Sequence, residues 1–101
     1  MKSKLILIGD LDNCRLELFE VDSYANASKK QLLDMPLNED TMVLDLGNDS
    51  VFVKYQDTTR KFEKEKLPAV FEIDADEKSE KTFAEFSTFI EWLRYIRNSC
   101  Q

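Results

Sequence analysis

The stretch AVFEIDADEKSEKTFAEFSTFIEWLRYIR (residues 69–97) changes its hydrophobic period part of the way along. Phe71 and Ile73 alternate with acidic residues, which is the two-residue period of a half-buried strand. The later apolar residues recur at spacings of three and four within about 140° of a helical wheel: Phe83, Phe86, Phe89, Ile90, Leu93 and Ile96. The stretch therefore predicts a strand over 69–74 followed by a long amphipathic helix.

Both ends of the predicted helix carry terminal signals. Thr82 and Glu85 have the three-residue spacing of a capping box. Arg94 and Arg97 lie in the last turns, where the helix dipole favours cations. We expect the box to begin the helix and the arginines to stabilise its end.

The segment DADEKSEKTFAE (74–85) matches a calcium loop only in part. With Asp74 at position 1 of an EF-hand loop, Asp76 and Glu85 fall at ligand positions 3 and 12. Lys78 occupies ligand position 5, the glycine of position 6 is missing, and the segment follows a predicted strand rather than a helix. We therefore interpret its first seven residues as an acidic strand-to-helix turn without a metal, close to the positive end of the helix.

Two hairpins are predicted upstream. KLILI (4–8) and CRLELFEVD (14–22) flank the turn residues GDLDN. The alternation in the second run changes phase at Leu18-Phe19, which indicates a bulge or a two-sided strand. A further hairpin is expected over 41–56 around a Gly-Asn-Asp turn, with Met42, Leu44 and Leu46 on one face and Val51, Val53 and Tyr55 on one face of its second strand.

The remaining segments complete the predicted fold. Residues 27–35 end at Pro36 and are predicted to form a short helix with Leu32, Leu33 and Met35 inward. Residues 60–66 extend the second hairpin with Phe62 inward. The pattern as a whole predicts one α+β domain over residues 1–101, in which an antiparallel sheet of hairpins is covered by the C-terminal helix.

The charge balance restricts the class of partner. The chain has 14 basic and 20 acidic residues and a net charge of -6. Proteins that bind nucleic acid or anionic membranes neutralise phosphates with Lys and Arg, so neither is an expected partner. Complementary charge favours a basic protein instead, although a solvated face of mixed charge explains the same residues equally well.

The cysteines and the N-terminus suggest a cytoplasmic protein. The apolar run at residues 5–9 is too short for a signal peptide or a spanning helix. Cys14 and Cys100 lie near opposite ends without a CxxC spacing, and in a reducing compartment we expect two small apolar side chains rather than a disulfide.

Catalytic groups are scarce. The chain has no His, which removes the commonest general base. Its two glycines, Gly9 and Gly47, cannot build a phosphate-binding loop. Cys14 has no visible cationic activator. We expect neither an enzyme nor a bound cofactor or metal, with a small enzyme or metal-binding module kept as an alternative.

The candidate partner-binding residues are acidic and aromatic. If the 41–56 hairpin and the 69–74 strand share a sheet, Asp45, Glu72 and Asp74 fall on one solvent side. Trp92 lies on the flank of the helix and Tyr95 opposite its apolar stripe, where aromatic residues suit binding hot spots; for Trp92, covering the protein's own sheet is the stronger alternative. The predicted set comprises Asp45, Asp49, Glu72, Asp74, Asp76, Glu77, Glu80, Trp92 and Tyr95.

These features favour a small acidic inhibitor that binds a basic enzyme of the nuclease-toxin type and occludes its active site or substrate surface. In size, acidity and lack of catalytic groups the chain resembles the immunity proteins of bacterial toxin–immunity pairs, a resemblance of type that no motif carries. A phage-type nucleic-acid mimic is the alternative from a related class. The partner and the oligomeric state are left open by the sequence.

Overall fold

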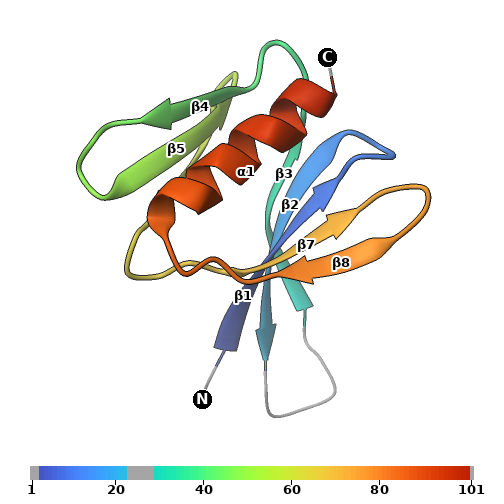
Figure 1. Ribbon diagram of the computed structural model, residues 1–101, viewed down its shortest axis with the longest axis horizontal. Helices are drawn as coiled ribbons and strands as arrows, with labels where there is room; N and C mark the ends of the chain where they lie inside the picture. The colour runs from blue at the N-terminus through green and yellow to red at the C-terminus, as the bar shows by residue number, and fades with distance from the viewer. Residues whose placement is uncertain (1–2, 23–28, 101) are drawn as a thin grey trace.

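A computed structural model of the protein describes residues 3–22 and 29–100. Strands dominate this part of the chain, and one helix lies near its C-terminal end (Figure 1). The elements in chain order are β1 (Ser3–Asp10), β2 (Arg15–Asp22), β3 (Lys29–Pro36), β4 (Met42–Asp45), β5 (Ser50–Tyr55), β6 (Thr58–Glu63), β7 (Ala69–Ile73), β8 (Lys78–Lys81) and α1 (Phe86–Ser99).

The strands form two sheets, and the predicted α+β class is confirmed. One sheet has the order β3-β2-β1-β7-β8, and the other has the order β4-β5-β6. The prediction of a wholly antiparallel sheet is wrong, because β1 pairs with β7 in parallel from Ile6 opposite Ala69 to Asp10 opposite Ile73. Between β1 and β7 the chain forms the three strands of the other sheet and then returns. The alternation of neighbouring residues therefore cannot predict that these two strands pair.

The predicted hairpins are present. β1 pairs with β2, and β4 pairs with β5 around the turn that contains Gly47 and Asp49, both with positive φ. The expected irregularity at Leu18-Phe19 is confirmed as a shift in the register between β2 and β3. β6 extends the second hairpin with Phe62 buried, as predicted.

The predicted helix over 27–35 is wrong; its first two residues lie outside the described part, and the rest belongs to β3. Leu33 and Met35 are buried whereas Leu32 and Asp34 are less so, which is the two-residue period of a strand. Pairing with β2 supplies the backbone hydrogen bonds that a helix of this length cannot keep by itself.

The segment after β7 also differs from expectation. Residues 78–81 form β8, an edge strand paired with β7, so Asp74–Glu77 is a hairpin turn and not a strand-to-helix turn. Helix α1 starts only at Phe86, with Glu85 as its N-cap residue and no side-chain cap hydrogen bond. The predicted capping box at Thr82 is therefore wrong, and the acidic turn does not lie at the helix N-terminus.

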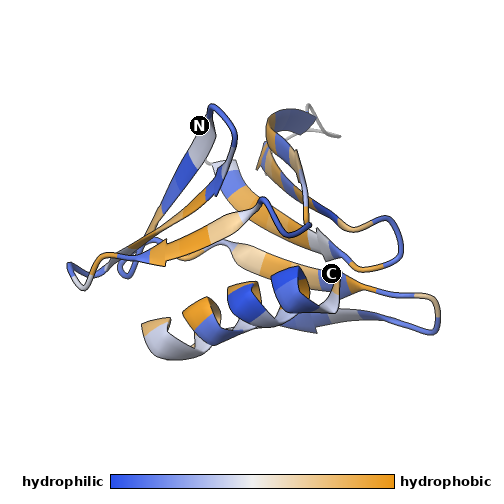
Figure 2. Ribbon diagram, turned by 90° about the horizontal axis from the view of Figure 1, so that it is seen from above, coloured by the Kyte–Doolittle hydropathy of each residue, from blue (hydrophilic) through white to orange (hydrophobic). Residues whose placement is uncertain are grey.

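Helix α1 covers the core between the two sheets. It crosses one side of the molecule, and most of the strands lie behind it (Figures 1 and 2). Phe89, in its first turn, is fully buried and meets Phe62 of β6 at 5.5 Å between ring centroids. The other fully or almost fully buried side chains include Leu7, Leu16, Leu18, Met35, Val51, Val53, Val70, Leu93 and Ile96.

A disulfide joins Cys14 to Cys100, so the expectation of two unpaired cysteines is wrong. Cys14 lies in the β1–β2 turn and Cys100 follows α1, and their Cα atoms are 5.6 Å apart. The packing of α1 across the sheets brings together residues separated by 86 positions. The bond fixes the C-terminal end of the helix to the first hairpin.

Candidate functional site

Five carboxylates gather where β1 and β7 end side by side. Parallel pairing brings both carboxyl ends to one edge, and the Leu11 N–H donates to the Ile73 carbonyl at 2.8 Å. This contact holds the β1–β2 turn against the β7–β8 turn. We call the resulting group the acidic edge: Asp10, Asp12, Asp74, Asp76 and Glu77.

Two members of the acidic edge hold its turns in shape. The Asp10 carboxylate accepts hydrogen bonds from the Asn13 backbone N–H at 3.1 Å and from Asn13 Nδ2 at 2.9 Å. Asp74 Oδ1 accepts from the backbone N–H groups of Asp76 and Glu77, both at 3.0 Å. Both turns are therefore preformed, which lowers the entropy cost of binding through them.

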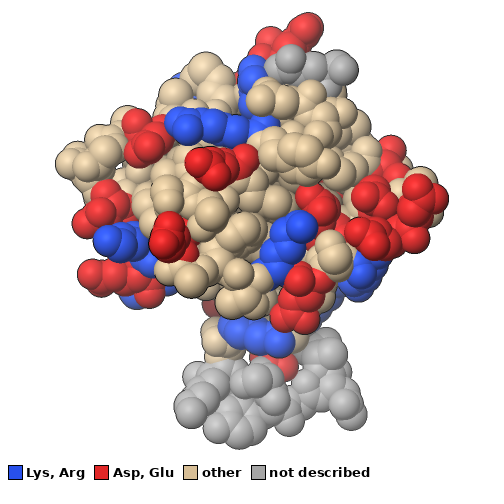
Figure 3. Space-filling model, in the orientation of Figure 1, with Lys and Arg blue, Asp and Glu red and all other residues tan. Residues whose placement is uncertain are grey.

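The other three members, Asp12, Asp76 and Glu77, are exposed. Figure 3 shows acidic side chains gathered at the right-hand side of the molecule, over the β1–β2 and β7–β8 turns. Within residues 3–22 and 29–100 no Lys or Arg forms an ion pair with any member of the acidic edge. The described basic residues that do form ion pairs meet Asp34, Glu63 and Glu72.

Lys78 is the nearest cation along the chain, and it turns away from the edge. Its Nζ lies 5.3 Å from the centroid of the Phe71 ring, on the face of the sheet remote from α1. Lys78 therefore forms no ion pair with the acidic edge among the described residues.

Glu72 and Trp92, both predicted to bind a partner, contact each other. Trp92 is only 6% exposed, and its Nε1–H donates to Glu72 Oε1 at 3.3 Å. Glu72 Oε2 also meets Lys81 Nζ at 3.3 Å. The indole packs over Gly9, so Trp92 covers the protein's own sheet, the stronger of the two expectations for it. These side chains hold α1 on the sheet.

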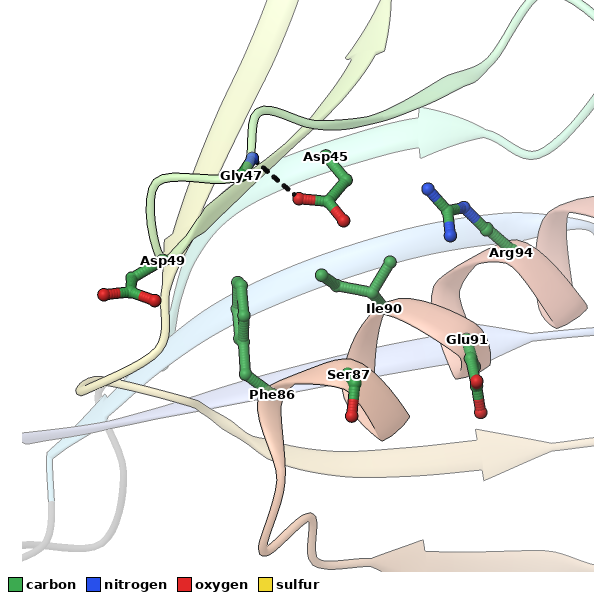
Figure 4. A pocket seen from close by; sticks show the side chains of 8 residues that line it. All are labelled: Asp45, Gly47, Asp49, Phe86, Ser87, Ile90, Glu91 and Arg94. Atoms are coloured by element: carbon green, nitrogen blue, oxygen red, sulfur yellow. Dashed lines mark hydrogen bonds between the residues drawn. The ribbon is translucent and has the colours of Figure 1, made fainter.

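Asp45, at the end of β4, and Asp49, in the β4–β5 turn, lie away from the acidic edge on the other side of α1 (Figure 1). They line a hollow of about 250 Å³ together with Phe86, Ile90 and Arg94 of the helix. Figure 4 shows the Asp45 carboxylate turned toward Gly47 and the Phe86 ring between Asp45 and Asp49. The carboxylates do not converge, and Asp45 Oδ1 is used by the Gly47 N–H at 3.0 Å.

The predicted residues therefore do not share one surface. Asp45 belongs to the three-stranded sheet, whereas Glu72 and Asp74 lie at the end of the five-stranded sheet, so the expectation that one sheet carries them is wrong. Glu80 projects from the face of β8 opposite α1. Tyr95 is 55% exposed on the solvent side of the helix. Asp74, Asp76 and Glu77 are the predicted residues that the fold brings together.

The set predicted from the sequence lacks Asp10 and Asp12. Both are acidic turn residues, but their membership of the site depends on the parallel pairing of β1 with β7. The continuous apolar run Leu5–Ile8 is the available signal, because such runs are typical of strands in parallel sheets.

Residues 3–22 and 29–100 contain neither a metal-binding cluster nor a membrane-spanning helix. Nowhere among them do three Asp, Glu or Cys side chains stand close enough to hold a metal ion. The one helix in this part of the chain, α1, has 14 residues and is neither long enough nor apolar enough to cross a bilayer.

Comparison of the whole chain with protein-family models, curated proteins and solved structures finds no match.

Proposed function

We propose that the protein is an inhibitor that binds a basic enzyme of the nuclease-toxin type through the acidic edge. The observation that carries the proposal is that parallel pairing places five acidic residues at one end of the sheet, and none of them forms an ion pair among the described residues. A nuclease presents Lys and Arg where it binds phosphates. Carboxylates that meet those side chains occupy the substrate surface and raise the rate of encounter.

The shape of the edge supports a protein partner rather than a small ligand. The exposed carboxylates stand on two projecting turns, and the turns are held by hydrogen bonds of the backbone. A preformed, projecting surface enters a concave site with little loss of conformational entropy. Tyr95 remains a predicted aromatic contact, whereas the engagement of Glu72 with Trp92 removes both from the proposed contact surface.

The disulfide bears on where the partner is met. Disulfides persist in oxidising compartments and are rare in a reducing cytoplasm. The Cys14–Cys100 bond therefore fits an encounter outside the cytoplasm better than the cytoplasmic location that the sequence suggests.

The test is capture of the partner from source cells followed by assay of its activity. Three baits are compared: the wild type, an edge variant with Asp12→Lys and Asp76→Lys, and a control variant with Asp40→Lys and Asp57→Lys. All four aspartates are exposed, and both variants change the net charge by the same amount. We expect a basic enzyme that is retained by the wild type and the control, is lost from the edge variant, and is inhibited at equal molar ratio by the wild type.

Three outcomes overturn the proposal. A captured partner without a basic surface removes its electrostatic basis. Equal retention by the edge variant moves the contact to another surface. A bound enzyme that keeps its full activity shows that the protein is not an inhibitor.

A further inference from the structure

The five-stranded sheet has a second apolar face, on the side away from α1. Ile6 of β1 lies opposite Phe19 of β2 and Ala69 of β7, and Ile8 lies opposite Phe71. These residues alternate along their strands with the buried Leu7, Leu18 and Val70, so they point to the opposite side. We call this group the outer face: Ile6, Ile8, Phe19, Ala69 and Phe71.

No helix or strand of residues 3–22 and 29–100 packs over the outer face. All five residues are half-buried, and none belongs to the buried core or to the described apolar residues packed against it. Figure 2 shows the helix along one side of the strands only. A contiguous apolar surface at the centre of a sheet is typical of an interaction site.

The sequence of β1 also indicates that the outer face is covered. Strands that are buried on both faces are continuous apolar runs, whereas strands with one solvated face alternate apolar and polar residues. β1 has such a run from Leu5 to Ile8 and pairs in parallel with β7. The helix covers one face, so the sequence of β1 is that of a strand with a second cover.

The charges around the outer face indicate which molecule covers it. The charged residues that the registers place on the same side are Lys4, Asp10, Arg15, Glu17, Lys29, Asp34, Lys78 and Glu80. Four are basic and four are acidic, so this side is neutral in a chain whose net charge is -6. Neither a strongly basic nor a strongly acidic partner is favoured here. A second copy is favoured, because two neutral faces that carry both signs meet without net repulsion although each chain is acidic.

We infer that two copies of the chain pack face to face through their outer faces, with Ile6 and Ile8 at the centre of a two-fold interface. Lys29 and Lys78 lie over the rings of Phe19 and Phe71 in the single chain, with Nζ 4.3 Å and 5.3 Å from the centroids. In the dimer these lysines move to the rim of the interface, where their charges stay in water, and expose the rings to the other copy.

Sedimentation equilibrium of the full chain tests the dimer, from low micromolar to submillimolar concentration. The single chain has a mass of 11.8 kDa, and we expect the apparent mass to rise to twice that value. Ile8→Arg places a charge at the centre of the interface and should leave a monomer. Leu44→Arg is the matched control, because Leu44 is 38% exposed on a strand of the other sheet, and it should dimerise like the wild type.

Fold and salt give two further readouts. Ile8→Thr keeps the β-branch of the side chain, and we expect it to weaken dimerisation about tenfold, close to 1.4 kcal/mol; it decides the case if circular dichroism shows that Ile8→Arg is unfolded. Added salt should strengthen the dimer, because it screens repulsion between two acidic chains. Binding through the acidic edge should weaken in salt, so the two proposals fail independently.

The inference is overturned by a wild type that stays monomeric at every concentration, which is also the result expected if a different protein covers the outer face. It is overturned equally by a folded Ile8→Arg or Ile8→Thr variant that dimerises as tightly as the wild type. Loss of the dimer in Leu44→Arg places the contact on the other sheet and has the same consequence.

Discussion

Gly9 marks the closest approach of the helix to β1, and its missing side chain makes room for Trp92. A Cβ at Gly9 would lie 2.9 Å from Trp92 Cζ2 and 3.1 Å from Ile96 Cδ1. Gly9→Ala should therefore displace the indole from Glu72 and lower the free energy of unfolding by about 1–3 kcal/mol. Urea denaturation measures the loss.

Gly47 provides the matched control. It has a φ of +70° and nothing within 4 Å of an added Cβ. Because Asn tolerates this backbone region, Gly47→Asn should change the free energy of unfolding by less than about 0.5 kcal/mol. Equal losses in the two variants would show that the contact with Trp92 is not what excludes a side chain at Gly9.

The Cys14–Cys100 bond acts mainly on the unfolded chain. It closes a loop of 86 residues in sequence separation, and a cross-link of that length stabilises the fold by about 4 kcal/mol in the chain-entropy model. Replacing both cysteines with Ser should cost about that amount. A reducing agent should lower the stability of the wild type to the level of the variant; a wild type that is indifferent to the reductant would contradict the bond.

At the scale of elements, α1 is stabilised by its buried stripe rather than by its exposed aromatic residue. Phe89 is fully buried and lies 5.5–6.4 Å, between ring centroids, from Phe62, Phe83, Phe86 and Trp92. Phe89→Ala should lower the free energy of unfolding by about 3–5 kcal/mol in thermal melts, which is a large fraction of the stability of an ordinary domain. Tyr95→Ala should change the free energy of unfolding by less than about 0.5 kcal/mol in thermal melts. A loss as large as that of Phe89→Ala would show that the helix buries a different face.

The elements predicted correctly are those whose signals are local. Alternation over 41–56 and the three-four spacing after Phe83 depend on neighbouring residues alone, and both elements are present. β3 and β8 were missed because their short sequences take the strand conformation only through pairing with β2 and β7. The same dependence hid two of the five residues of the acidic edge, since Asp10 and Asp12 join it only through a pairing between distant strands.

At the scale of the whole molecule, the acidic edge should cost stability in the free protein. Asp76→Lys relieves repulsion between neighbouring carboxylates and should raise the free energy of unfolding by about 0.5 kcal/mol at low salt. Asp57→Lys changes the net charge equally on a turn elsewhere and should raise it less. The difference should vanish at high salt in urea titrations; a destabilised Asp76→Lys variant would show that the edge serves the fold.

The association rate constant with the captured enzyme tests the acidic edge most directly. It is compared at low and physiological salt for the wild type, Asp12→Lys/Asp76→Lys and Asp40→Lys/Asp57→Lys. We predict that the edge variant has an association rate constant at least about tenfold below that of the wild type and loses most of its salt dependence. The control variant should keep most of the wild-type rate and most of its salt dependence. Equal slowing of the two variants would mean that only the total charge of the molecule matters, and that result would contradict the account.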